Sequence, residues 1–345
     1  MYKESNNDDL KNFAPNLLKT FAIIFLGLGL LLFITVLIPI LFFQRIPLNP
    51  KNITELSYVT SGIIGTLFTI GGTFLLYLNL RKQNDSFQIE RFENRYFELI
   101  RIYRDNVKDI ETILPDNERG YKIHGREVFM EINRQFILIT QRLKAWEFEK
   151  FTEIDVLSLP QIAYLIVFFG FSNSGSIMLK YHLDKLKIDE KYPGLKGFIF
   201  DDSELGVKKS AYSNVFAFYN GHQISLGHYF RHLFSTINYV HRNDVLTSRQ
   251  KYEYVKILRT QMSTYEQAVF FYNSFSPMGY IWELSKRDIE YNFKFKEDGD
   301  QYRDEDLLIT RYGLIKNIPE GFTGSLNPKH FYKKLIFEGE EINVG

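Results

Sequence analysis

Two long apolar runs dominate the first quarter of the chain. They cover residues 21–43 and 58–80, and neither run contains a charged side chain. Because an α-helix rises about 1.5 Å per residue, each run makes a helix of roughly 35 Å, enough to cross the roughly 30 Å of hydrocarbon in a bilayer. We therefore expect a hairpin of two transmembrane helices over residues 21–80, preceded by a short cytosolic tail, residues 1–20.

A helical pattern continues without interruption beyond the second run. Over residues 79–113 the apolar positions recur every three or four residues, which is one face of an amphipathic helix. These positions are Ile89, Phe92, Tyr96, Leu99, Tyr103, Val107 and Ile110. The pattern predicts that the second span continues as one helix to Ile113 and ends at Leu114-Pro115.

Further segments have the apolar spacing of helices, and they are residues 126–149, 162–171, 223–241, 249–275 and 305–312. The run 162–171 is too short to span a membrane and predicts a buried core helix. Residues 192–207 contain Pro193-Gly194 and predict a loop with room for a small β-hairpin. The expected fold is mainly α, with minor irregular or β-hairpin content. It comprises a cytosolic core domain over residues 81–275 and a mixed helical and irregular extension over residues 276–345.

The basic residues around the two spans predict their orientation. Lys3, Lys11 and Lys19 precede the first span, and Arg81, Lys82, Arg91 and Arg95 follow the second. The connecting loop, residues 44–57, has only Arg45 and Lys51. Because basic loops stay in the cytoplasm, both termini are expected on the cytoplasmic side of the membrane.

Composition narrows the chemistry of the cytosolic part. The chain has no cysteine, which excludes disulfides, thiolate nucleophiles and cysteine-ligated zinc and fits a reducing compartment. Five of the 42 basic and four of the 41 acidic residues lie in residues 1–80, so residues 81–345 carry 37 of each. A neutral domain argues against broad electrostatic binding of RNA, although it leaves room for a local basic groove.

The segment 223–241 has one polar face that carries candidate chemistry. Leu226, Phe230, Leu233, Ile237 and Val240 form an apolar stripe, and His228, Arg231 and His232 lie opposite it. His228 and His232 have the i, i+4 spacing that lets two imidazoles reach one metal ion, but a zinc site needs a third protein ligand, and no metal or cofactor is predicted. The face is either a solvated or hydrogen-bonded surface, or a site for an anion such as an RNA phosphate.

The next predicted helix, 249–275, places charges beside its apolar stripe. Arg259, Glu266 and Asn273 are spaced by seven residues and fall on one line at the edge of that stripe, with Gln261 close by. Because an unpaired buried ion is costly, these groups are expected to form a polar network, with Arg259 and Glu266 facing the His/Arg surface of the neighbouring helix.

The second span has a stripe of small residues. Ser61, Gly65, Thr69 and Gly72 are spaced by four, four and three residues, a pattern that allows close approach of transmembrane backbones. The stripe packs either against Gly27 and Gly29 of the first span or against another copy of the chain.

Four segments resemble the putative phage abortive infection proteins that are called AbiC-like. They follow the order of that family and are residues 92–99 (FENRYFEL), 125–129 (GREVF), 226–233 (LGHYFRHL) and 257–266 (ILRTQMSTYE). The resemblance implies antiphage defence by a two-span protein that faces the cytosol. It transfers no catalytic residue, although its segments include His228, Arg231, Arg259 and Glu266.

Two main classes of function follow from these observations, beside a third in which the chain is a scaffold that recruits another defence protein through its polar face. In the first, the chain is a membrane-anchored defence protein that senses or executes the response through oligomerisation and membrane perturbation, with a phage-derived or host protein as trigger. In the second, it is a membrane-tethered, metal-independent ribonuclease or nucleotide-acting enzyme. That enzyme would use His228 or His232 for proton transfer and Arg231 or Arg259 to neutralise phosphate.

Overall fold

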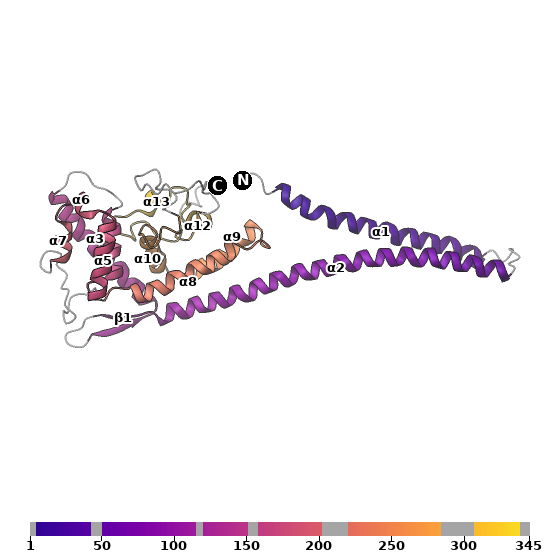
Figure 1. Ribbon diagram of the computed structural model, residues 1–345, viewed down its shortest axis with the longest axis horizontal. Helices are drawn as coiled ribbons and strands as arrows, with labels where there is room; N and C mark the ends of the chain where they lie inside the picture. Colours follow the sequence, from indigo (N-terminus) through magenta and orange to yellow (C-terminus); the bar gives the residue numbers. More distant parts are fainter. Residues whose placement is uncertain are drawn as a thin grey trace. The chain divides into compact units, whose positions relative to one another are not determined.

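The computed structural model describes residues 5–42, 50–114, 120–150, 158–201, 220–283 and 307–338. The chain forms two compact units, residues 1–93 and residues 94–345 (Figure 1). The expected fold class is confirmed, because the chain is mainly α-helical and the described residues contain one two-stranded hairpin.

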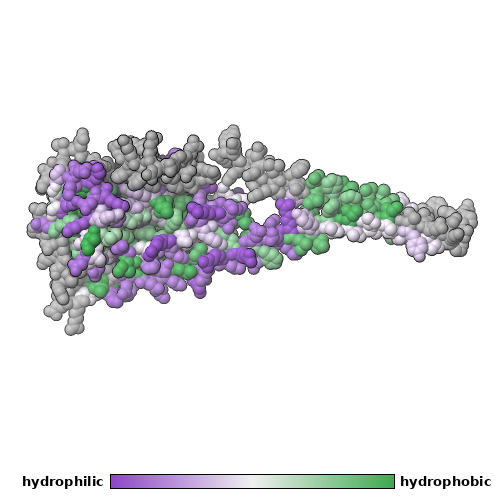
Figure 2. Space-filling model, in the orientation of Figure 1, coloured by the Kyte–Doolittle hydropathy of each residue, from purple (hydrophilic) through white to green (hydrophobic). Residues whose placement is uncertain are grey.

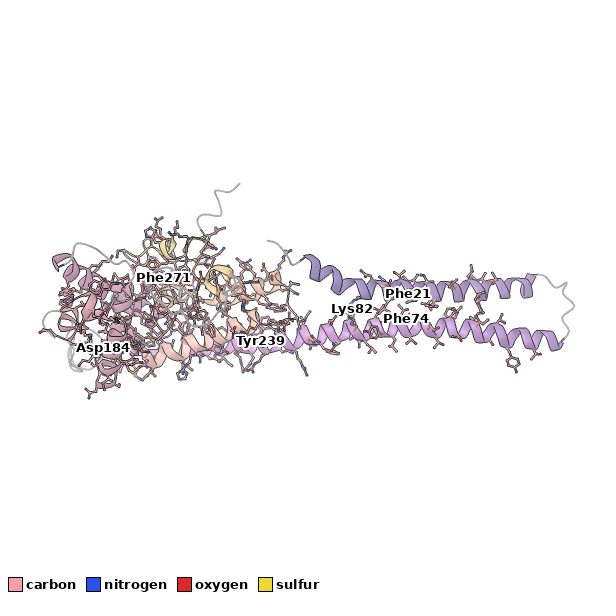
Figure 3. The ribbon with its side chains drawn as sticks, turned by 45° about the horizontal axis from the view of Figure 1, so that its top comes forward. Phe21, Phe74, Lys82, Asp184, Tyr239 and Phe271 are labelled. Carbon is pink, nitrogen blue, oxygen red and sulfur yellow. The ribbon has the colours of Figure 1, made fainter. Side chains whose placement is uncertain are left out.

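The first unit is built from two long helices, α1 (Ser5–Phe42) and the greater part of α2 (Pro50–Asp109). Both helices are long and apolar enough to cross a membrane. They pack closely at Gly71, where an added Cβ would lie 2.6 Å from Cγ of Leu26 and 3.3 Å from the carbonyl of Ala22. The rings of Phe25 and Phe74 meet one turn away, with centroids 6.2 Å apart (Figure 3 labels Phe74).

The predicted small-residue stripe lies on another side of α2. Gly65 and Gly72 have open space where a Cβ would be, and Ser61 and Thr69 are exposed. The Thr69 hydroxyl donates to the carbonyl of Gly65 in its own helix, at 2.7 Å. The stripe therefore does not pack on the first helix among the described residues, and its contact with another copy stays a prediction.

The predicted helix end at Ile113 is wrong. Helix α2 ends at Asp109, and Glu111–Leu114 is strand β1, which pairs antiparallel with β2 (Tyr121–His124) in the register Glu111↔His124. Gly125, at φ +60°, closes this hairpin by donating its N–H to the carbonyl of Ile110 at 2.8 Å. Ile113 follows Ile110 at the three-residue spacing of a helix, so the apolar pattern alone does not mark the helix end. Thr112 and Ile113 are β-branched and favour a strand.

Helices α3 (Arg126–Lys150) and α4 (Ser158–Phe169) pack against each other in the second unit. Both were predicted as helices, α4 over residues 162–171, so it begins four residues earlier and ends two residues earlier than predicted. Residues 159–171 are buried almost throughout, which confirms the buried core helix. Helix α3 also packs on α10 (Thr264–Ser274), where the rings of Phe136 and Tyr272 stack at 3.6 Å.

The loop predicted at 192–207 is instead partly helical. After α5 (Asn173–Lys185) come two short helices, α6 (Ile188–Lys191) and α7 (Leu195–Phe200), and residues 202–207 lie outside the described chain. Gly194 is left-handed, at φ +86°, and directly precedes α7. The Pro193-Gly194 turn therefore separates two helices and not two strands.

Helix α8 (Gln223–His241) has the predicted bounds, but the single helix predicted over 249–275 is wrong. Two helices replace it, α9 (Ser248–Gln261) and α10. Ser263 begins α10 with a capping box, in which its hydroxyl accepts from the N–H of Glu266 and the Glu266 carboxylate accepts from the N–H of Ser263. The line through Arg259, Glu266 and Asn273 therefore does not exist on one helix.

The C-terminal segment packs against the same core. Helix α12 (Leu308–Tyr312) forms, whereas residues 305 and 306 of the predicted helix lie outside the described chain. Around α13 (Pro328–Phe331), Phe331 packs on Phe271, and the Tyr332 hydroxyl donates to Oγ of Ser274 at 2.6 Å. Trp282 is buried between the rings of Phe234 and Phe270.

Candidate functional site

The two most accessible candidates, His228 and Arg231, lie on the exposed face of α8. The opposite face is buried, as its apolar stripe predicted. The Arg231 guanidinium donates through Nε to the carbonyl of Gly227 at 3.0 Å, within the same helix. These two side chains therefore form an exposed polar surface.

His232 faces a different direction and has a structural partner. Its Nε2 lies 2.9 Å from the carbonyl of Leu99 in α2. Because a carbonyl only accepts hydrogen bonds, Nε2 carries the proton, and the ring joins α8 to α2. Within the described ranges, no group of three His, Asp or Glu side chains is placed to hold a metal ion.

Glu266 is the most constrained polar group of the candidate set. Its side chain has no exposed surface, and its position at the third residue of α10 follows from the capping box with Ser263. The carboxylate Oε2 accepts a short hydrogen bond from the hydroxyl of Tyr103, on α2, and lies 3.4 Å from the hydroxyl of Tyr229, on α8. We call Glu266 and its partners Tyr103, Arg126, Tyr229 and Ser263 the Glu266 cluster.

Arg126 supplies the positive charge of the Glu266 cluster. Its Nε donates to Oε1 of Glu266 at 3.3 Å, and its Nη2 donates to the carbonyl of Gln261 at 2.8 Å. The Arg126 side chain is 62% exposed, whereas Glu266 is fully buried. As the first residue of α3, Arg126 therefore joins three helix ends: the start of α3, the end of α9 and the start of α10.

The electrostatics of the Glu266 cluster favour neutral tyrosines. Burial raises the pKa of Tyr103 well above its ordinary value, and the negative charge of Glu266 raises it further. Burial also raises the pKa of Tyr229, with additional contributions from Tyr103 and Glu266. Both hydroxyls therefore keep their protons at neutral pH and act as donors to the carboxylate.

Arg259 is buried and serves a different element. Its Nη1 donates to the carbonyls of Tyr312 and Gly313, at 2.7 and 3.3 Å, at the C-terminal end of α12. Gly313 has φ +62°, and an added Cβ would lie 2.8 Å from that Nη1. The expected pairing of Arg259 and Glu266 with the His/Arg surface is wrong among the described residues, because each has the partners given above.

The remaining predicted polar residues have local roles. Asn273 is buried and donates through Nδ2 to the hydroxyl of Tyr164 at 2.9 Å. Gln261 takes part through its backbone carbonyl, which accepts from Arg126. The structure thus brings Glu266 and the Gln261 carbonyl together, and it places His228, Arg231, Arg259 and Asn273 in other surroundings.

A second series of buried side-chain hydrogen bonds joins α3 to the start of α8. Nε2 of His222 donates to Oε1 of Gln135 at 2.9 Å, and Nε2 of Gln135 donates to Oε1 of Glu131 at the same distance. Arg134 binds both Glu131 oxygens, at 2.6 and 2.8 Å. Burial lowers the pKa of His222 to about 4, so this imidazole is neutral at pH 7.

The comparisons with known proteins bear on the segment that holds α8, α9 and α10. Residues 221–297 match the family model described as putative phage abortive infection protein. The resemblance expected from the sequence is confirmed over these residues. No curated protein and no solved structure matches the chain.

The abortive infection match contains only part of the Glu266 cluster. Tyr229, Ser263 and Glu266 lie inside residues 221–297, whereas Tyr103 and Arg126 come from α2 and α3. The matched segment therefore completes its buried polar cluster with side chains from outside the match.

Sequence reasoning identified Glu266 but not its partners. Apolar spacing predicts Tyr103 as a core residue, and Arg126 stands only at the start of a predicted helix and within a resembling segment. The pattern Ser263-x-x-Glu266 is a capping box, and it was the available signal that a helix starts at this point. Nothing in the spacing of Arg126 or His222 indicates a buried carboxylate or amide partner.

Proposed function

We propose that the chain is a membrane-anchored antiphage defence protein of the abortive infection type. The observation that carries this proposal is the match of residues 221–297 to the abortive infection family. We place the protein in the inner membrane of a bacterium, with two spans and with both termini in the cytoplasm. The proposed role of the second unit is to sense infection by contact with a phage-derived or host protein, or to execute the response.

The surface of the first unit supports the membrane anchor. Large apolar side chains of both helices are exposed, among them Ile23, Leu31, Ile63 and Leu76. Figure 2 shows a green, apolar surface on this unit. A contiguous apolar surface of this kind is costly in water, and hydrocarbon covers it without cost. The basic residues that follow the second span support a cytoplasmic second unit.

Response through assembly in the membrane is the finer part of the proposal. The stripe of Ser61, Gly65, Thr69 and Gly72 is exposed on α2, so it is available to a neighbouring helix. Oligomerisation along this stripe is the mechanism that we propose for membrane perturbation.

The alternative, a ribonuclease or nucleotide-acting enzyme, has weaker support. Two of its four residues bind other elements of the chain, because His232 binds the carbonyl of Leu99 and Arg259 binds the end of α12. An enzyme of this class would depend on His228 and Arg231, which lie on an open helix face.

A phage challenge tests the proposal and separates it from the enzyme. Cells that express the chain should form fewer plaques than vector controls across a phage panel. The double variant His228→Ala/Arg231→Ala should retain this protection, because neither side chain contributes to the buried core. Loss of protection by a normally accumulated double variant would favour the enzyme, and absence of protection by the wild type from every phage would contradict the defence function.

A further inference from the structure

The last four turns of α2, residues 94–109, bind the rest of the second unit through one face. The buried side chains of this face are Tyr96, Leu99, Ile100, Tyr103 and Val107. The opposite side is exposed and carries Phe97, Arg101, Arg104 and Asp105. The segment is therefore an amphipathic helix seated on an apolar surface.

Three hydrogen bonds reinforce this seat at successive turns of the helix. The Tyr96 hydroxyl donates to the carbonyl of Tyr254, His232 donates to the carbonyl of Leu99, and the Tyr103 hydroxyl donates to Glu266. Their partners Tyr254, His232 and Glu266 all lie within residues 221–297. The segment that matches the abortive infection family thus supplies these polar contacts to α2.

The contact with Glu266 differs from the other two because it involves a buried charge. A hydrogen bond to a charged group is stronger than one between neutral groups. If α2 leaves, Oε2 of Glu266 loses the Tyr103 donor, yet the Tyr229 hydroxyl already lies 3.4 Å from the same oxygen. Arg126 and the N–H of Ser263 stay bound to Oε1. Oε2 of Glu266 therefore keeps the Tyr229 donor in the released state.

We propose that the Tyr103–Glu266 contact is a latch that holds residues 94–109 of α2 on the α8–α10 segment and that can open without leaving Glu266 unsatisfied. In the closed state Tyr103 donates to Oε2. In the open state the Tyr229 hydroxyl is the remaining donor to Oε2, and the last turns of α2 are free. Helix α2 also carries the second candidate span, so an open latch changes the cytosolic end of the same helix.

Amide hydrogen exchange of the full-length chain in detergent tests the latch. Tyr103→Phe keeps the ring and removes the hydroxyl, so exchange in residues 94–109 should accelerate about tenfold or more, as expected for loss of a hydrogen bond to a charge. Tyr272→Phe is the matched control. It removes an equally buried hydroxyl that donates to Asn133 at 2.6 Å, away from α2. The control should leave residues 94–109 unchanged relative to the rest of the unit.

Two further variants distinguish a latch from a general loss of stability. Glu266→Gln combined with Tyr103→Phe should accelerate exchange in residues 94–109 less than the product of the two single effects, because both changes weaken the same Tyr103–Glu266 contact. Tyr229→Phe should instead slow exchange in residues 94–109 relative to the wild type, because it removes the donor that satisfies Oε2 in the open state. Equal acceleration across the whole second unit by Tyr103→Phe, or none in residues 94–109, would overturn the latch.

The latch rests on the proposed defence function only for its biological role. The exchange experiment needs no phage, so a failed phage challenge with selective acceleration in residues 94–109 would contradict the function and keep the latch. Protection by the wild type without selective acceleration would contradict the latch and keep the function.

Discussion

A carboxylate without exposed surface needs several hydrogen-bond donors, and Glu266 has four. Tyr103, Arg126, Tyr229 and the N–H of Ser263 come from separate elements of the chain. Removing one partner of a buried charge costs more than the net contribution of the pair, because the remaining charge stays buried. Substitutions at this one residue are therefore felt in α2, α3, α8 and α10 together.

His222 makes the stability of the second unit depend on pH. Burial lowers its pKa in the folded protein to about 4, against about 6.5 in an unfolded chain. The unfolded state therefore binds the proton first, and as the pH falls from about 6.5 to about 4 the free energy of unfolding decreases by on the order of 3 kcal/mol. Thermal unfolding of the wild type in detergent at several pH values measures this slope.

The matched variant for this prediction is His222→Gln, which keeps a donor for Gln135 and cannot titrate. Its unfolding temperature should depend less on pH over the same window, whatever its value at pH 7. The charged groups that Gln135 links to this imidazole, Glu131 and Arg134, bind each other. Equal slopes for wild type and variant would rule out His222 as the titrating group.

At the scale of elements, helix periodicity located the helices well and their ends less well. Helices α3, α4 and α8 were predicted from apolar spacing, because each buries one face or all faces against the core. The break between α9 and α10 was missed, because the apolar spacing continues across Met262 and Ser263 and only the capping box marks the new start. Partners from distant segments, such as Tyr103 and Arg126 for Glu266, have no local signal at all.

Two adjacent glycines of α2 allow a sharp test of helix packing in the first unit. Gly71→Leu would force side-chain atoms into Leu26 and the carbonyl of Ala22, at a cost of about 1–3 kcal/mol, whereas Gly72→Leu would enter open space. Spin labels at Lys19→Cys and Leu80→Cys, both exposed positions, would report the separation of the two helices. The distance distribution should broaden for Gly71→Leu alone.

The converse result would also be informative. Disruption by Gly72→Leu, with Gly71→Leu tolerated, would contradict the observed packing and would identify the Ser61–Gly72 stripe as the face that holds the helices.

At the scale of the whole molecule, the absence of cysteine makes the topology directly measurable. Single cysteines at Asn49, in the connecting loop, and at Gln83, after the second span, should react differently with a membrane-impermeant maleimide. With both termini cytoplasmic, Asn49→Cys is labelled in intact cells with a permeabilised outer membrane, and Gln83→Cys only after lysis. The reverse labelling pattern would show the opposite orientation, with both termini outside the cytoplasm. Labelling of both cysteines in intact cells would contradict the two spans.

Tryptophan fluorescence distinguishes the two units, because both tryptophans lie in the second unit. The chain contains only Trp146 and Trp282, and both are buried in the second unit, whereas the helical hairpin has none. Intrinsic fluorescence at the red edge of excitation thus reports the second unit alone, in detergent or in lipid. Quenching by a brominated lipid would then register only an approach of that unit's core to the bilayer, with no background from the spans.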